Sequence, residues 1–234
     1  MKLLLFRQAL FIGLMSLLVS CSSGPPPPDW QMNAQDAIER SIEAYLAGNI
    51  RIEIQEFMRA KSEIARTGRA DLLARIELMR CASQVASLAL VDCAGFEKLR
   101  PDAANPERAY ANFLAGHLQN QDIALLPLQH HAVARLVTNG SNDTAAVHAL
   151  QSVADPMSRL VGAGVLFQQA QAGPGVLALA VETASLQGWR RPLLAWLGVQ
   201  RLRAEKADDS TEVERLRRRI ELVQNAPFAT KPAP

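Results

Sequence analysis

The four histidines are the first residues to consider for chemistry, because a neutral imidazole binds transition metals. They are His117, His130, His131 and His148. His130 and His131 are adjacent, and adjacent side chains on a helix point about 100° apart. A helical zinc site instead places two ligands four residues apart, and the sequence has no H-E-x-x-H motif and no Cys/His cluster. His117 follows Gly116 and is typical of a helix C-terminus. We therefore predict no metal ion and no other cofactor.

No residue has the sequence context of a catalytic nucleophile or acid. There is no G-x-S-x-G motif, and the glycines of 162–164 and 173–175 do not match a phosphate-binding loop. Close helix packing and a turn between helices explain those glycines better. Helical lytic transglycosylases pair a catalytic Glu with a following Ser, and no such pair occurs. Glu182 lies in the apolar segment 176–186, but we expect it to point outward. We predict that the protein is not an enzyme.

The N-terminus has the pattern of an export signal. Lys2 and Arg7 precede an apolar segment, residues 9–19, which small residues follow. A basic start before a short apolar segment is typical of a secretory signal peptide. The segment is shorter than the roughly 20 apolar residues that span a bilayer. We expect residues 1–20 to be removed.

The apolar segment ends in Leu18-Val19-Ser20-Cys21, which resembles the lipobox of bacterial lipoprotein precursors. The resemblance implies that Cys21 carries the lipid and becomes the first residue of the mature chain. In that family an Asp after the Cys usually retains the protein at the inner membrane. Ser22 occupies this position, which implies anchoring at the outer membrane on its periplasmic face. The alternative is a plain signal peptide in which the Cys has no special role.

Residues 21–30 are expected to be a tether. They contain four consecutive prolines, Pro25 to Pro28, which favour an extended polyproline II conformation. At about 3.1 Å per residue, the tether would hold the rest of the chain roughly 25–30 Å from the lipid.

Cys81 and Cys93 remain in the mature chain, and two thiols in an exported domain are usually paired. An unbroken helix between them would separate them by about 18 Å, which is too far for a bond. A disulfide therefore requires the helix to end near Ser87 or Leu88 and the chain to turn back. We favour this disulfide over two buried free thiols. There is no C-x-x-C motif, so a thioredoxin-like redox role has no support.

The charge balance argues against nucleic acid as a partner. The chain has 25 Lys+Arg and 23 Asp+Glu, and two of the basic residues precede Cys21, so the mature chain has 25 − 2 = 23 of each. A nucleic-acid-binding domain would have a clustered basic surface, and an aromatic content of 5% leaves little for base stacking. Four arginines between 215 and 219 form a local basic run that three glutamates partly offset. We interpret this run as a solvated helix face, with an acidic partner or a lipid headgroup as the alternative.

The body of the chain, residues 31–225, is predicted to be one all-α domain, followed by a disordered tail, 226–234. Asn33 is the expected N-cap of the first helix, and Gly48 its end. In the second helix, an apolar face is expected from Ile50 and Ile54 together with Phe57, Ala60 and Ile64. Further helices are predicted over 69 to about 87, 106–116, 128–138, 144–153, 156–171, 175–187, 192–207 and 210–224.

Two patterns suggest repeated helical hairpins. Residues 44–60 resemble the middle of a tetratricopeptide repeat, although Glu53 occupies a position where that family has a small residue. A shift of 36 residues also aligns Pro156, Gly162 and Leu166 with three identical residues near 192–202. The sequence is compatible with a degenerate array of this type, an α-solenoid, or with an irregular helical bundle.

Three functions follow as expectations. The first is a protein-binding adaptor in the cell envelope, because helical-hairpin scaffolds commonly present docking surfaces. The second is a carrier of a small apolar ligand or lipid, suggested by the apolar segment 160–186. The third is a cell-wall enzyme with Glu182 as its acid. The expected partners are the membrane, through the lipid anchor, and an unidentified envelope protein.

Overall fold

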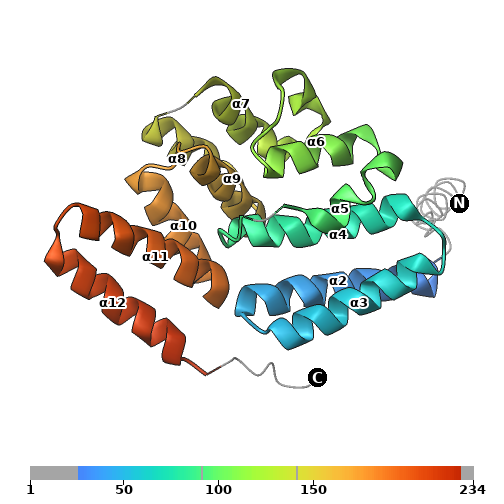
Figure 1. Cartoon of the computed structure of the whole chain (residues 1–234), viewed down its shortest axis with the longest axis horizontal. Coiled ribbons are helices and arrows are strands. Elements are labelled where there is room, and N and C mark those ends of the chain that lie inside the picture. The colour runs from blue at the N-terminus through green and yellow to red at the C-terminus, as the bar shows by residue number, and fades with distance from the viewer. Residues whose placement is uncertain (1–25, 91, 141, 228–234) are drawn as a thin grey trace, which may run out of the picture.

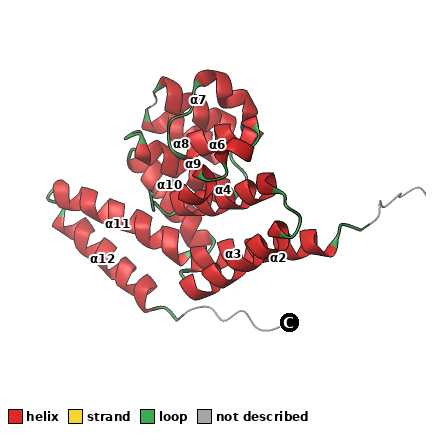
Figure 2. Cartoon of the chain, turned by 45° about the vertical axis from the view of Figure 1, so that its right-hand side comes forward, coloured by secondary structure: helices red, strands yellow, loops and turns green. Residues whose placement is uncertain are grey.

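The described part of the chain is all-α. The computed structural model describes residues 26–90, 92–140 and 142–227, and within these ranges it contains helices and loops but no strand (Figure 2). This confirms the predicted fold class. The α-helices are α2 (Asp29–Ala47), α3 (Ile50–Ala65), α4 (Ala70–Ala86), α5 (Ala94–Glu97), α6 (Asn105–Leu114), α7 (His131–Asn139), α8 (Asp143–Gln151), α9 (Pro156–Gln168), α10 (Pro174–Leu186), α11 (Arg190–Lys206) and α12 (Ser210–Asn225). Three short 3₁₀ helices are η1 (Arg100–Asp102), η2 (Asn120–Leu125) and η3 (Leu128–His130).

The N-terminal hairpin of α2 and α3 packs beside α4 (Figure 1). Helix α2 begins at Asp29, earlier than the predicted cap at Asn33, which lies inside the helix. The early start is favourable because Asp29 places a carboxylate in the first turn, directly after the extended Pro28. Gly48 ends the helix with a φ of 90°, a left-handed conformation that glycine adopts at little cost. Asn49 then caps α3 by accepting a hydrogen bond from the Ile52 N–H.

The interior face of α3 differs from the prediction. Ile50 and Ile54 are 55% and 50% exposed, whereas Glu53 is only 3% exposed. Phe57, Ala60 and Ile64 are buried, as expected. A glutamate can occupy the interior here because Arg80 of α4 donates to its carboxylate at 2.7 Å. The periodicity located the helix, but the partner on α4 decided which face is buried.

Helix α4 lies between the N-terminal hairpin and the rest of the molecule. It packs against α9 and α6 on one side and against α2 and α3 on the other (Figure 1). The buried indole N–H of Trp196 in α11 donates to the carbonyl of Ala86 at the end of α4. Most buried apolar residues form one core around α4, and a smaller apolar cluster lies among α2, α3 and α4.

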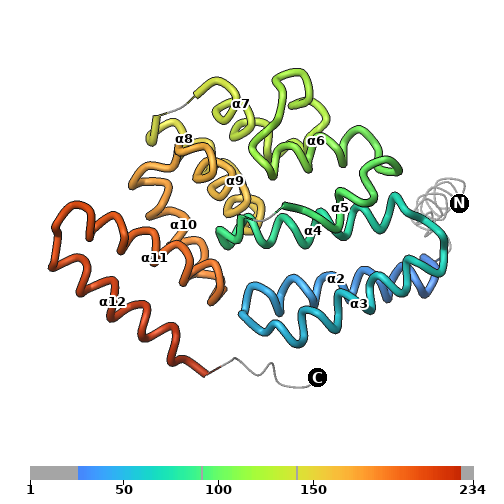
Figure 3. The backbone as a smooth tube through the Cα atoms, in the orientation of Figure 1, coloured from blue at the N-terminus to red at the C-terminus, as the bar shows by residue number. Residues whose placement is uncertain are grey.

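The C-terminal helices α9, α10, α11 and α12 each pack against the next, and the tube trace shows the chain doubling back between them (Figure 3). Helix α11 also contacts α2, so the C-terminal helices meet the N-terminal hairpin. The glycines related by the 36-residue shift have different surroundings. A Cβ on Gly162 would lie 3.0 Å from a Leu150 methyl carbon, whereas a Cβ on Gly198 would meet nothing within 4 Å. The all-α arrangement is compatible with both predicted architectures, the irregular helical bundle and the degenerate repeat array.

Candidate functional site

The two cysteines of the body are brought together. The Cα atoms of Cys81 in α4 and Cys93 just before α5 are 5.7 Å apart, and their sulfur atoms are within bonding distance. The predicted condition is met, because α4 ends at Ala86 and the chain turns back with Leu88 at a φ of 56°. Cys93 borders a groove of about 710 Å³ between the α4–α5 loop and α6. Its rim carries charges of both signs, contributed by Asp92, Glu97, Lys98 and Arg100.

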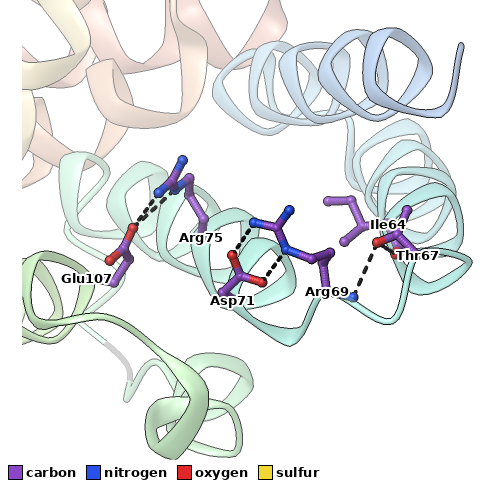
Figure 4. Close-up of polar contacts among 6 residues, drawn as sticks. All are labelled: Ile64, Thr67, Arg69, Asp71, Arg75 and Glu107. Atoms are coloured by element: carbon purple, nitrogen blue, oxygen red, sulfur yellow. Dashed lines mark hydrogen bonds and ion pairs between the residues drawn. The ribbon is translucent and has the colours of Figure 1, made fainter. Parts of the chain in front are cut away.

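A second groove, of about 510 Å³, opens between α2 and α4 and is called here the α2–α4 groove. Its floor belongs to the small apolar cluster and consists of Trp30, Ala34, Ile38, Ile64, Leu72, Ile76 and Met79. Arg69 and Arg75 stand on its α4 rim. Both arginines are already bound to carboxylates, as Figure 4 shows. Arg69 donates to Asp71 at 2.6 and 2.8 Å, and Arg75 donates to one oxygen of Glu107 at 2.7 and 3.2 Å.

Hydrogen bonding to the Arg69 guanidinium lowers the pKa of Asp71 to about 2, so this carboxylate stays ionised. The turn before α4 is also satisfied. The Thr67 hydroxyl donates to the Ile64 carbonyl at 2.7 Å and accepts from the Arg69 N–H at 3.2 Å (Figure 4). The rim of the α2–α4 groove is therefore charged but internally neutralised.

A third groove, of about 490 Å³, lies between α11 and α12 and is called here the α11–α12 groove. Its lining is apolar apart from a few polar residues and two arginines, and it contains no carboxylate: Ala47, Asn49, Ser185, Gly188, Arg190, Leu193, Leu197, Arg219, Leu222, Val223, Ala226 and Pro227. Leu197 is fully buried in the floor, whereas Leu222 on the rim is 74% exposed. Leu186, at the end of α10, is 76% exposed but does not line this groove.

Two adjacent arginines hold the walls of the α11–α12 groove. Arg190 donates to the carbonyls of Gln224 and Ala226 at the end of α12. Arg191 donates to the Tyr45 carbonyl at 2.8 Å, near the end of α2. Both cations lie at the negative end of a helix dipole, which favours them. The first turn of α11 thus links the C-terminal ends of two other helices.

The predicted basic run is divided by the fold. Arg215 pairs with Glu212, and Arg217 pairs with Glu214 and Glu221, all on the exposed surface of α12. For these two arginines the interpretation as a solvated face is confirmed. Arg219 instead lines the α11–α12 groove and forms no ion pair within the described residues.

The histidines are not gathered at one place. His130 is 2% exposed and lies against the rings of Tyr110 and Phe113, at centroid distances of 5.5 and 5.1 Å. Burial lowers the pKa of His130 to about 4, so its imidazole is neutral at pH 7. The His131 Nε2 is 2.9 Å from the Leu126 carbonyl oxygen, while His117 is exposed just after α6. Among the described residues, no group of three or more His, Cys, Asp or Glu could hold a metal ion.

The other sequence-derived candidates have structural roles or lie on the surface. Glu182 is exposed, as expected, so it has no surroundings of a buried acid. A Cβ on Gly164 would clash with the Val85 carbonyl of α4, which confirms close helix packing. At the glycines of 173–175, the Asp143 carboxylate accepts from the Gly175 and Val176 N–H groups at 2.7 and 3.1 Å. This segment is a turn that leads into a capped α10.

Cys21, the expected lipidation site, lies outside the described residues. Within the described ranges, no helix combines the length and apolar character that crossing a bilayer requires. In comparisons with known proteins, no family model, no curated protein and no solved structure matches the chain.

Sequence reasoning did not find the pair Arg190–Arg191 or single out Arg219. One signal was present. Two cations at the start of a helix interact unfavourably with the positive end of that helix's dipole. Their presence there indicates that they bind acceptors on other elements. Their acceptors are main-chain carbonyls, which have no signature in a sequence.

Proposed function

We propose that the protein is a lipid-anchored adaptor that binds another envelope protein on the periplasmic face of the outer membrane. The observation that carries this proposal is the α11–α12 groove, which has an apolar floor and an exposed leucine, Leu222, on its rim. A concave apolar surface with a few polar groups is the usual form of a binding site. Exposed apolar residues that gather at such a groove are typical of a protein interface.

The proposed location rests on three features. Residues 18–21 have the lipobox pattern, and the prolines before α2 provide a tether. Cys81 and Cys93 lie at bonding distance, which suits an oxidising compartment such as the periplasm. These features support export and anchoring independently of the groove.

The test is crosslinking of the tagged protein in living cells, followed by mass spectrometry. A Cys21→Ala variant is the control for the anchor. We expect one recurring envelope protein at high yield, with reduced recovery from the variant. A chain that crosslinks to no envelope protein above background would contradict the adaptor function. Incorporation of labelled palmitate into the wild-type chain, and not into Cys21→Ala, tests the lipid itself.

A second candidate function is a carrier of a small apolar ligand. The apolar segment 160–186, which first suggested it, is explained by core packing, since most of its apolar residues are buried. The α2–α4 groove is the feature that favours it, because its floor is apolar and its volume is within the range of ligand sites. Native mass spectrometry of gently extracted protein would show copurified lipid. Repeated absence of bound lipid would count against a carrier.

A further inference from the structure

We propose that the α11–α12 groove binds a segment of the partner protein that combines apolar side chains with a carboxylate. This inference rests on the proposed adaptor function and specifies the chemistry of its partner. Three observations carry it: an apolar floor, a lining with arginines but no carboxylate, and walls that are fixed before binding.

The apolar component comes from Leu193, Leu197 and Val223, which form the floor, and from Leu222 on the rim. A cavity of about 490 Å³ is large enough for a few apolar side chains but not for a whole helix. Burying such side chains contributes about 25 cal/mol per Å² of apolar surface removed from water. Leu222 on the rim would become covered as the segment binds.

The charge distinguishes this groove from the others. Arg190 and Arg219 line it, and its lining contains no carboxylate. In the α2–α4 groove, by contrast, both rim arginines are paired with carboxylates. The groove beside Cys93 has acidic and basic residues together. An anionic group on the occupant would therefore bind most favourably in the α11–α12 groove, because no carboxylate of the lining competes with it.

The groove is also held open by its surroundings. Arg190 binds the last carbonyls of α12, and Arg191 binds the Tyr45 carbonyl of α2. Because these contacts exist in the free protein, little ordering is needed on binding, which favours affinity. Arg190 is occupied by these carbonyls, so Arg219 is the residue that would meet the partner's carboxylate directly.

The test is fluorescence anisotropy with a labelled synthetic peptide that has leucines on one side and glutamates on the other. A matched peptide has lysine at every glutamate position. The protein is the full mature chain carrying Cys21→Ser, so that no detergent is needed. We expect the acidic peptide to bind at least about tenfold more tightly than the basic one. Arg219→Glu should abolish this preference, whereas Arg217→Glu, on the exposed side of α12, should leave it unchanged.

Leu222→Glu provides a second variant, since Leu222 is too exposed for the change to unfold the chain. This substitution should lower the affinity for the acidic peptide by about tenfold, while the circular dichroism spectrum stays the same. Equal affinity for the two peptides, or equal effects of Arg219→Glu and Arg217→Glu, would overturn the proposal. Binding that appears only after residues 228–234 are removed would identify the chain's own C-terminal segment as the occupant, and would also overturn it. The same holds if phosphatidylglycerol vesicles bind through Arg219 and the peptide does not.

The two proposals can fail separately. If Arg219→Glu crosslinks to the same envelope protein in cells as the wild type, the adaptor function stands and the groove is not its site. If no envelope protein is found but the peptide binds with the expected charge preference, the groove is a binding site and the adaptor function fails.

Discussion

Arg191 and Tyr45 join the C-terminal helices to the N-terminal hairpin. The Arg191 guanidinium lies 4.3 Å from the centre of the Tyr45 ring, and its Nε donates to the Tyr45 carbonyl at 2.8 Å. The residues are 146 positions apart in the sequence. One side chain thus supplies a cation–π contact and a charged hydrogen bond between α11 and α2. Burial raises the pKa of Tyr45, although the nearby Arg191 charge opposes this, so the phenol stays neutral.

Removing this link should destabilise the protein. We expect Arg191→Ala to lower the free energy of unfolding by about 2 kcal/mol, because a charged hydrogen bond and a cation–π contact are lost. Urea denaturation measures the change. Arg51→Ala, at an exposed arginine on α3, is the control and should change stability by less than about 0.5 kcal/mol. Equal effects of the two substitutions would show that the contact contributes nothing measurable.

The buried carboxylate of Glu53 should depend on Arg80. In Arg80→Ala the carboxylate loses the ion-pair partner that donates to it at 2.7 Å, so we expect destabilisation by about 3 kcal/mol. Arg217→Ala breaks two exposed ion pairs, with Glu214 and Glu221, and should cost less than about 1 kcal/mol. Restoring stability with a double variant, Arg80→Met with Glu53→Gln, would support the pairing. A stability close to wild type in Arg80→Ala alone would contradict it.

His130 should make stability depend on pH. Its pKa is lowered by burial from 6.5 to about 4, and the Asp155 charge opposes this while His131 adds to it. Between pH 6.5 and 4 the unfolded chain binds a proton that the folded chain does not, so stability falls as the pH is lowered through this window. The resulting decrease in the free energy of unfolding approaches about 3 kcal/mol. The difference between the urea midpoints at pH 7 and pH 4.5 should be smaller for His130→Gln than for the wild type. An identical pH dependence in both proteins would exclude His130 as its source.

Two glycines provide a matched test of helix packing. Gly164→Ala places a methyl group against the Val85 carbonyl of α4, so we expect destabilisation by about 2 kcal/mol or more. Gly198→Ala meets nothing within 4 Å and should stabilise the protein by up to about 1 kcal/mol, because alanine favours the helix. Thermal unfolding distinguishes the two. Opposite signs are expected, and destabilisation by both would mean that α11 is packed more tightly than the structure has it.

The disulfide should be present in protein exported to the periplasm. Intact-mass measurement after alkylation should find no free thiol at Cys81 or Cys93, and both should be alkylated after reduction. Because the bond closes a short loop, Cys93→Ser should lower stability by about 3 kcal/mol on the chain-entropy estimate. Two alkylated thiols in unreduced protein would contradict the bond.

Local signals explain why the helices could be located from the sequence. Asn142, Asp155 and Asp209 each accept a hydrogen bond from the N–H three residues later, at the start of a helix. Gly48 and Gly188 provide left-handed turns between helices. These features act within a few residues of the chain, so periodicity and capping residues are enough to predict them.

The same reasoning could not locate the α11–α12 groove. Arg219 was visible as part of a basic run, but only the packing of α12 on α11 separates it from Arg215 and Arg217. Likewise, Ile50 and Ile54 were predicted to face the core because they share a helical face with Phe57. Their exposure follows from the position of α4, which supplies Arg80 as the partner of Glu53.

The sequence by itself determined the all-α class, the positions of most helices and the export pattern that ends at Cys21, because each depends on neighbouring residues. It also determined that Cys81 and Cys93 could bond only if the chain turned after Ser87. The tertiary structure decided which face of α3 is buried, where Arg190 and Arg191 bind and which arginine of α12 lines the α11–α12 groove. These depend on contacts between residues that lie tens to more than a hundred positions apart, which no local pattern encodes.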